Sequence, residues 1–113
     1  MKARSAKAKG RRFQKEIYEL LMKHFDNVLQ EGDLKPSLMS EQGEDIKKSP
    51  AAIKVFPYSV ECKSQEKLNI WSALKQAEEN CPTGQTPLVA FKKNRSNIYV
   101  ALKFEEFLKL LKN

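Results

Sequence analysis

The chain has 113 residues, which is enough for one domain with a single hydrophobic core and too few for two. It contains 21 lysine and arginine residues against 14 acidic ones, and the formal net charge of +7 favours a polyanionic partner, either nucleic acid or an anionic membrane surface. No apolar stretch resembles a signal peptide or approaches the length of a membrane span, so we expect a cytoplasmic protein, or a viral protein acting in the cytoplasm of its host.

Positive charge is concentrated at the N-terminus, where every charged residue before Glu16 is basic. Residues 1–10 have the composition of a solvated, partly disordered arm, and a mobile basic arm is also suited to neutralising phosphates. The basic residues expected to contact phosphates here are Lys7, Lys9, Arg11 and Arg12.

A helical period begins at Phe13, because apolar residues then recur at intervals of three and four. The buried stripe consists of Phe13, Ile17, Leu20, Leu21, His24 and Val28. Glu16 lies at the edge of this stripe, as either an ordinary flanking charge or a carboxylate directed into a cleft. His24 is interpreted as a packed or edge histidine rather than a catalytic one.

Residues 29–44 contain glycine, proline and serine without a period, which predicts a loop with room for a short extended piece. The loop ends in the sequence GEDI, which places Asp45 at the start of a short strand. The following SPAAIKVFP is predicted to be a turn and then a strand through Ile53, Val55 and Phe56.

The segment YSVECKS at residues 58–64 alternates like a strand. Side chains two apart share a face, so Glu61 and Lys63 point the same way. They are either a solvent-exposed ion pair of little energetic consequence or the polar lining of a site.

The remaining elements complete an α/β or α+β domain, spanning residues 1–113, in which helices flank a central mixed sheet. We predict a helix over residues 70–80 with Asn69 as its N-cap, strands over 88–93 and 97–103 joined by a turn at 94–96, and a closing helix over 104–112. Lys92, Lys93 and Arg95 lie at the predicted turn, where they would contact the nucleic-acid backbone without reading bases.

Three acids could converge on a hard divalent cation, which prefers oxygen ligands. Glu16, Asp45 and Glu61 supply carboxylates, and Lys63 is placed to orient a water or to offset charge on a scissile phosphate. Zinc is not expected, because two cysteines and one histidine do not provide four close ligands.

GEDI followed by VECK resembles the two halves of the PD-(D/E)xK nuclease motif, and KGRRFQKEIYELL resembles the first helix of archaeal-type Holliday junction resolvases and their phage relatives. The similarity covers nearly the whole chain and implies a restriction-endonuclease-like fold and a role in DNA recombination or repair. Two features depart from the family pattern. Glu44 stands where the motif name has proline, and the stretch before Asp45 is longer than in compact resolvases.

Carried over residue by residue, the resemblance implies that Asp45, Glu61 and the Cys62 backbone carbonyl bind Mg²⁺ or Mn²⁺. Glu16 would assist directly or through water. Lys63 would position or activate the water that displaces the 3′ oxygen and leaves a 5′ phosphate. Ser37 or Ser40 matches the serine that some of these enzymes place near the metal, and Gln76 either matches a glutamine of related nucleases or is merely exposed. The resemblance also implies a homodimer, with the last helix and residues 56–58 as contacts. It implies neither a membrane partner nor a small-molecule cofactor.

Three functions remain open. The first is a metal-dependent endonuclease for branched DNA. The second is a nuclease of the same fold acting on flap, nicked or foreign duplex DNA. The third is a basic nucleic-acid-binding protein without catalysis, in which Glu61 and Lys63 are a surface pair. A pure binder has no reason to place carboxylates beside its phosphate-contacting surface, and this favours a nuclease.

Overall fold

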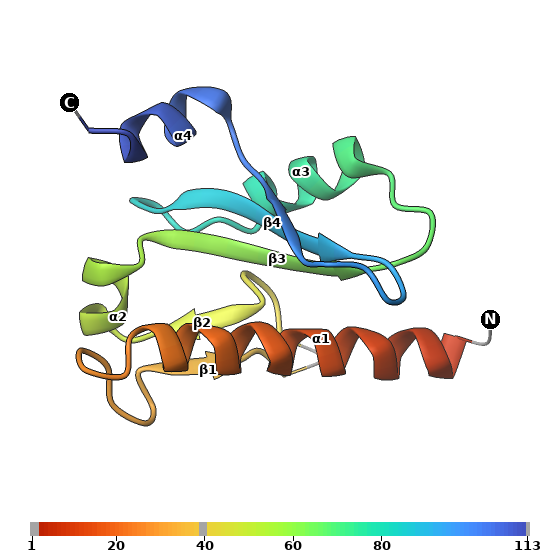
Figure 1. Cartoon of the computed structure of the whole chain (residues 1–113), viewed down its shortest axis with the longest axis horizontal. Coiled ribbons are helices and arrows are strands. Elements are labelled where there is room, and N and C mark those ends of the chain that lie inside the picture. The colour runs from red at the N-terminus through yellow and green to blue at the C-terminus, as the bar shows by residue number, and fades with distance from the viewer. Residues whose placement is uncertain (1–2, 39–40, 113) are drawn as a thin grey trace.

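The computed structural model describes residues 3–38 and 41–112 (Figure 1). Helices and strands follow one another in the order α1 (Ala3–His24), β1 (Leu34–Pro36), β2 (Ile46–Lys48), α2 (Pro50–Val55), β3 (Tyr58–Ser64), α3 (Ile70–Glu79), β4 (Thr86–Lys92), β5 (Tyr99–Ala101) and α4 (Phe104–Leu110). Among these residues, no helix combines the length and the apolarity required to cross a bilayer.

The central sheet has the order β3-β4-β5 and is mixed, as the sequence predicts. Strand β3 runs parallel to β4, with Glu61 opposite Val89, and β4 runs antiparallel to β5, with Phe91 opposite Tyr99. The expected hairpin is therefore confirmed. Strands β1 and β2 form a separate antiparallel pair, which meets the free edge of β3 where the Asp45 N–H donates to the Val60 carbonyl at 2.9 Å.

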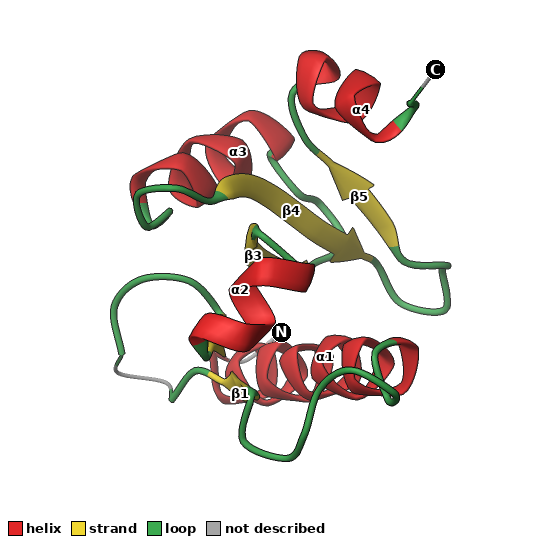
Figure 2. Ribbon diagram, turned by 90° about the vertical axis from the view of Figure 1, so that its left-hand side faces the viewer, coloured by secondary structure: helices red, strands yellow, loops and turns green. Residues whose placement is uncertain are grey.

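Helices cover both faces of the central sheet (Figure 2). Helix α1 packs Phe13 and Ile17 against one face, in a core that includes Val60 of β3 and Ala90 of β4. On the opposite face, α3 packs its two buried alanines against Val89. The two faces carry alternate residues of each strand, as the period of two requires.

Two helices differ from the predictions. Helix α1 already begins at Ala3, so residues 3–10, which have the composition of a mobile arm, are helical. The predicted strand through Ile53 and Val55 is wrong, because residues 50–55 form α2. Ser49 caps this helix by accepting a hydrogen bond from the Ala52 N–H at 3.1 Å, and proline at the first helical position is pre-organised for a helix start.

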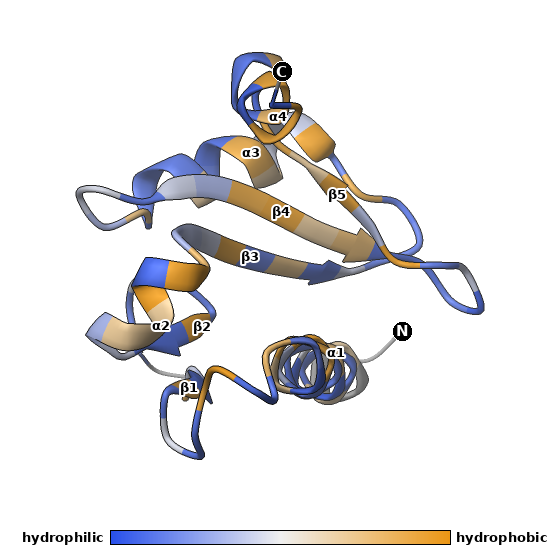
Figure 3. Ribbon diagram, turned by 60° about the vertical axis from the view of Figure 1, so that its left-hand side comes forward, coloured by the Kyte–Doolittle hydropathy of each residue, from blue (hydrophilic) through white to orange (hydrophobic). Residues whose placement is uncertain are grey.

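The other two helices agree with the sequence, including the Asn69 cap, whose side chain accepts from the Ser72 N–H at 3.1 Å. Helix α4 contains no buried residue. Phe104 is 71% exposed and Phe107 is 43% exposed, and Figure 3 shows hydrophobic residues on this helix at the end of the molecule away from α1.

Candidate active site

Strand β3 presents Glu61 and Lys63 to the face that α3 covers. Glu61 is buried, with 4% of its surface exposed, so the alternating strand does not simply turn this side chain toward water. Lys63 Nζ lies 3.7 Å from Glu61 Oε2, and the Asn80 side-chain amide at the end of α3 donates to Glu61 Oε1 at 3.4 Å. The ion pair that the sequence suggested is thus present, within a partly enclosed site.

Asp45 is fixed at the free edge of β3 by three hydrogen bonds. Its N–H donates to the Val60 carbonyl at 2.9 Å, and its own carbonyl accepts from the Ser37 N–H at 2.7 Å. Its Oδ2 accepts from the Cys62 N–H at 2.7 Å. Because Asp45 is joined to the residues on either side of Glu61, the two halves of the motif meet at one point of the sheet edge.

Burial disfavours the charge of both carboxylates. Burial raises the pKa of Asp45, while the hydrogen bond from Cys62 and the positive charge of Lys63 act in the opposite direction. Burial and then the negative charge of Asp45 raise the pKa of Glu61, against the effects of Asn80 and Lys63. Two acids with raised pKa values beside one lysine are typical of a functional site, and a bound cation would relieve their repulsion.

The donor set fits a hard divalent cation. The described residues contain no group of three or more His, Cys, Asp or Glu side chains arranged for a metal, so the carboxylates available here are Asp45 and Glu61. In an extended strand the N–H and carbonyl of one residue leave on the same side, so the Cys62 carbonyl faces the edge where Asp45 lies. Mg²⁺ is commonly held by only one or two carboxylates together with waters and substrate phosphates. Burial raises the pKa of the Cys62 thiol, which therefore stays neutral.

Glu44, which stands where the motif has proline, belongs to a buried ion pair. Its carboxylate contacts the Lys48 amine, whose side chain is fully buried, and the Gln85 side chain donates to Glu44 Oε2 at 3.4 Å. Burial lowers the pKa of Lys48 to about 8, and contact with a carboxylate favours its charged form. The substitution of the motif proline thus supplies a structural partner for a buried lysine.

A basic groove runs between α1 and the β4–β5 turn, with a volume of about 180 Å³. Its basic side chains are Lys9 and Arg12 from the helix and Lys92 and Arg95 from the hairpin. Four of the predicted DNA-contacting residues, distant in sequence, are therefore brought together. Glu16 lines the same groove, beside Ser64 at the end of β3.

Other predicted residues lie around the site. Gln76 is exposed on α3 and lines a hollow of about 140 Å³ that also contains Lys63, so these two side chains face the same space. Ser37 is buried and contacts Asp45 only through the backbone bond already described. Ser40 lies outside the described residues. Lys7 and Arg11 are exposed on α1.

Two polar residues at the site were missed from the sequence. The Gln14 side chain on α1 lowers the pKa of Asp45, and the Asn80 side chain donates to Glu61 Oε1. Gln14 and Glu16 are about 200° apart around α1, so only one of them can be directed at Asp45. Nothing in the local pattern distinguishes Gln14 from an exposed helix residue, whereas Asn80 is recognisable as a helix end but not as a partner of Glu61.

A family model described as "Phage putative PDDEXK endonuclease" matches residues 5–113. The match includes all but the first two residues of α1, both halves of the motif and the closing hairpin and helix. No curated protein and no solved structure matches the chain.

Proposed function

Because the chain belongs to the phage PDDEXK endonuclease family, we propose that it is a metal-dependent endodeoxyribonuclease that hydrolyses phosphodiester bonds in branched DNA. The observation that carries this proposal is the junction of Asp45 with Cys62, which sets two carboxylates and Lys63 at one strand edge. We further propose that the protein acts in the cytoplasm of a phage-infected cell.

Asp45, Glu61 and the Cys62 carbonyl would hold Mg²⁺, for which Mn²⁺ would substitute. When bound, the cation would neutralise charge on the phosphate oxygens and lower the pKa of a coordinated water. The Cys62 N–H and the Asn80 side chain hold the two carboxylates in position. Glu16, at the wall of the basic groove, would act through water.

Lys63 would orient the attacking water and offset charge that develops on the phosphate, because its ammonium is held next to Glu61 at the strand end. Displacement of the 3′ oxygen would leave a 5′ phosphate. Gln76 faces the same hollow as Lys63 and would help to order that water. The basic groove would hold the DNA backbone beside the reacting phosphate, at an affinity that falls with salt.

Branched DNA and a homodimer are the finer parts of the proposal. The resemblance of the first helix to junction resolvases supports the substrate. The exposed apolar side chains of α4 support a second copy as partner, which would place two active sites on opposite strands. Residues 56–58 are less suited to that contact, because Phe56 and Tyr58 pack against each other, with ring centroids 5.3 Å apart, at the edge of the core.

The test is cleavage of a labelled four-way junction in Mg²⁺, beside linear duplex, flap, nicked duplex and single strand. Asp45→Asn and Lys63→Ala should abolish cutting while binding persists. Asp26→Asn and Lys75→Ala change exposed residues of the same types and should cut like the parent protein.

Different outcomes contradict different parts of the proposal. Equal cleavage of every substrate would remove the branched-DNA preference and keep the nuclease. Cutting by Asp45→Asn and Lys63→Ala at the parent rate would show that the site is assigned wrongly. If no substrate is cut with Mg²⁺ or with Mn²⁺, the chain is a basic nucleic-acid-binding protein. Sedimentation of Leu108→Glu against the parent tests the dimer, since a charge on α4 should favour the monomer.

A further inference from the structure

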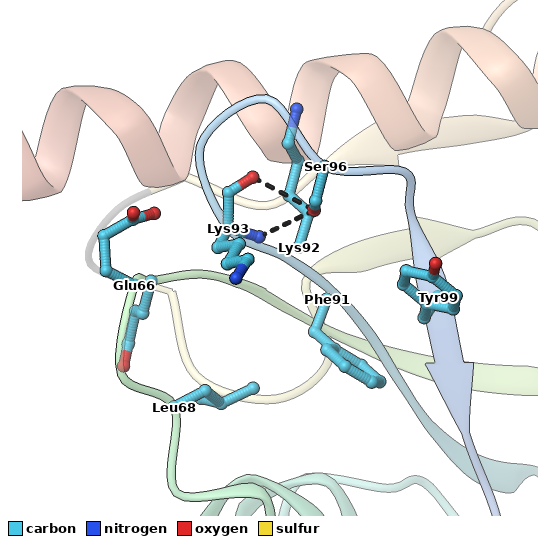
Figure 4. A pocket seen from close by; sticks show the side chains of 8 residues that line it. Glu66, Leu68, Phe91, Lys92, Lys93, Ser96 and Tyr99 are labelled. Carbon is cyan, nitrogen blue, oxygen red and sulfur yellow. Dashed lines mark hydrogen bonds between the residues drawn. The ribbon is translucent and has the colours of Figure 1, made fainter.

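A small pocket with an apolar floor lies beyond the ends of β3 and β4 (Figure 4). Leu68, Phe91 and Tyr99 form the floor of this aromatic pocket, which has a volume of about 220 Å³. The Phe91 and Tyr99 rings are tilted by 33°, with centroids 6.1 Å apart, and Tyr99 is 56% exposed. Small-molecule sites usually occupy about 300–1,000 Å³, so this pocket suits a single ring system rather than a whole cofactor.

The aromatic pocket borders the two hollows already described. It shares Lys92 with the basic groove, and it shares Gln65 and Leu68 with the hollow that contains Lys63. It therefore lies between the surface proposed to hold the DNA backbone and the residue proposed to act on the scissile phosphate. A strand that contacts both would therefore pass close to this pocket.

The rim of the pocket carries two lysines and one glutamate and is held in place by hydrogen bonds. The Lys93 N–H donates to Ser96 Oγ at 3.0 Å, and the Ser96 hydroxyl donates to the Lys93 carbonyl oxygen at 3.1 Å (Figure 4). Across the turn, the Asn94 N–H donates to Glu66 Oε2 at 2.5 Å. These bonds fix the turn, so that Lys92 and Lys93 stand beside the aromatic floor.

We propose that the aromatic pocket binds one unpaired nucleobase of the DNA substrate, stacked on Tyr99, with a neighbouring phosphate on Lys93. The inference rests on the proposed function and narrows its substrate class. Stacking on an exposed aromatic side chain accepts any base, because every base has a π face. A base inside an intact duplex cannot reach such a pocket, so the protein would prefer DNA with an unpaired base near the cut.

The charges favour this occupant over an apolar peptide or a free aromatic metabolite. A nucleotide in a strand combines a flat ring with an adjacent phosphate, and the pocket combines a flat apolar floor with adjacent lysines and borders the basic groove. The Glu66 carboxylate at the rim would repel a phosphate placed against it. It would accept a hydrogen bond from the amino group of a base, which is consistent with a base rather than a phosphate inside the pocket.

The experiment measures binding in EDTA, so that cleavage cannot interfere. The probes are a duplex with one bulged 2-aminopurine and the fully paired duplex of the same sequence. Binding is monitored by fluorescence anisotropy and by the intensity of 2-aminopurine fluorescence. The parent protein should bind the bulged duplex more tightly and quench its fluorescence. Tyr99→Ala should bind the bulged duplex about tenfold more weakly, as expected for loss of a stacking side chain, and the paired duplex unchanged.

Three variants separate stacking from folding and charge. Tyr99→Phe keeps the ring and should behave like the parent. Val100→Ala alters the adjacent residue on the opposite face of β5, which is 57% exposed, and should leave both affinities unchanged. Lys93→Gln should reduce the salt dependence of bulged-duplex binding by about one unit of slope, which keeps the proposal testable if Tyr99→Ala does not fold.

Equal affinity of the parent protein for the two duplexes would overturn the inference, as would an equal loss on both for Tyr99→Ala. A shift of Tyr99→Ala toward a monomer in sedimentation would also overturn it, because the pocket would then be an interface between copies. Failure of the proposed function has a different signature: no substrate is cut in Mg²⁺, although the bulge preference persists.

Discussion

Replacement of Lys63 by methionine should destabilise the metal-free protein, because Lys63 is the cation that offsets two crowded carboxylates. Methionine retains much of the apolar stem and removes the charge. Lys63 Nζ and Glu61 Oε2 are 3.7 Å apart, with side chains 20% and 5% exposed. At the same separation, Coulomb's law gives about 1 kcal/mol for a pair in water and about 4.5 kcal/mol at an effective dielectric constant near 20.

The free energy of unfolding should therefore fall by about 1–3 kcal/mol at pH 8, since solvent screens part of the interaction and an unpaired buried charge remains. The assay is urea unfolding in EDTA, with Lys75→Met as the control because Lys75 is exposed on α3. The loss should shrink as pH falls, because protonated Asp45 and Glu61 no longer attract an ammonium. Since the pKa values of both groups are raised, this change should occur at a higher pH than it would for ordinary carboxylates.

A Lys63→Met variant as stable as Lys75→Met at pH 8 would refute this reasoning. A loss that is the same at pH 8 and pH 4 would also refute it, because it would show that packing rather than charge is responsible.

Three further substitutions test the structure by urea unfolding. Asp45→Asn should raise the free energy of unfolding of the metal-free protein at pH 8 by about 0.5–2 kcal/mol. The pKa of Asp45 is raised on folding, so the folded protein binds extra protons and becomes less stable as pH rises above the ordinary value of 3.8. An advantage of Asp45→Asn that persists unchanged at low pH would contradict this. Ser49→Ala should cost about 1–2 kcal/mol through loss of the α2 cap, and a neutral result would show that the cap bond contributes nothing. Gly43→Ala should cost about 1–2 kcal/mol, because the residue has φ +97° and an added Cβ would lie 3.0 Å from a lysine amine. Gly10→Ala, in open space on α1, should instead stabilise the protein by about 0.5–1 kcal/mol. Equal effects would show that the backbone conformations of the two glycines are assigned wrongly.

Patterns confined to one segment identify the helices, with errors at their ends. The apolar interval of three and four from Phe13 identifies α1, although the helix runs from Ala3 to His24 and the Leu20 and Val28 side chains of the expected buried stripe are exposed. Asn69 before an apolar helical period places the start of α3. The region of residues 50–56 shows where this approach fails. Ile53 and Val55 favour a strand, whereas Ser49 and Pro50 favour a helix start, and the burial of Ala52 against the core accompanies the helical outcome.

The candidate site, too, was predictable only where neighbouring residues carry the signal. The spacing of Glu61 and Lys63 fixes that they share a face, but not what covers that face. Helix α3 buries Glu61 and is capped by Asn80, which donates to it, while Gln14 on α1 lowers the pKa of Asp45. These partners are far apart in sequence and carry no local signal, so sequence patterns could not identify them.

The sequence alone determined the motif, the basic charge and the order of most elements, because each depends on neighbouring residues and on the periods of helix and strand. Only the tertiary structure decided that Asp45 binds the Cys62 N–H, that Glu16 lines the basic groove, and that this groove borders the aromatic pocket at Lys92. These features depend on how α1, the sheet edge and the hairpin turn pack together, and such long-range packing is set by the burial of the whole core rather than by any single segment.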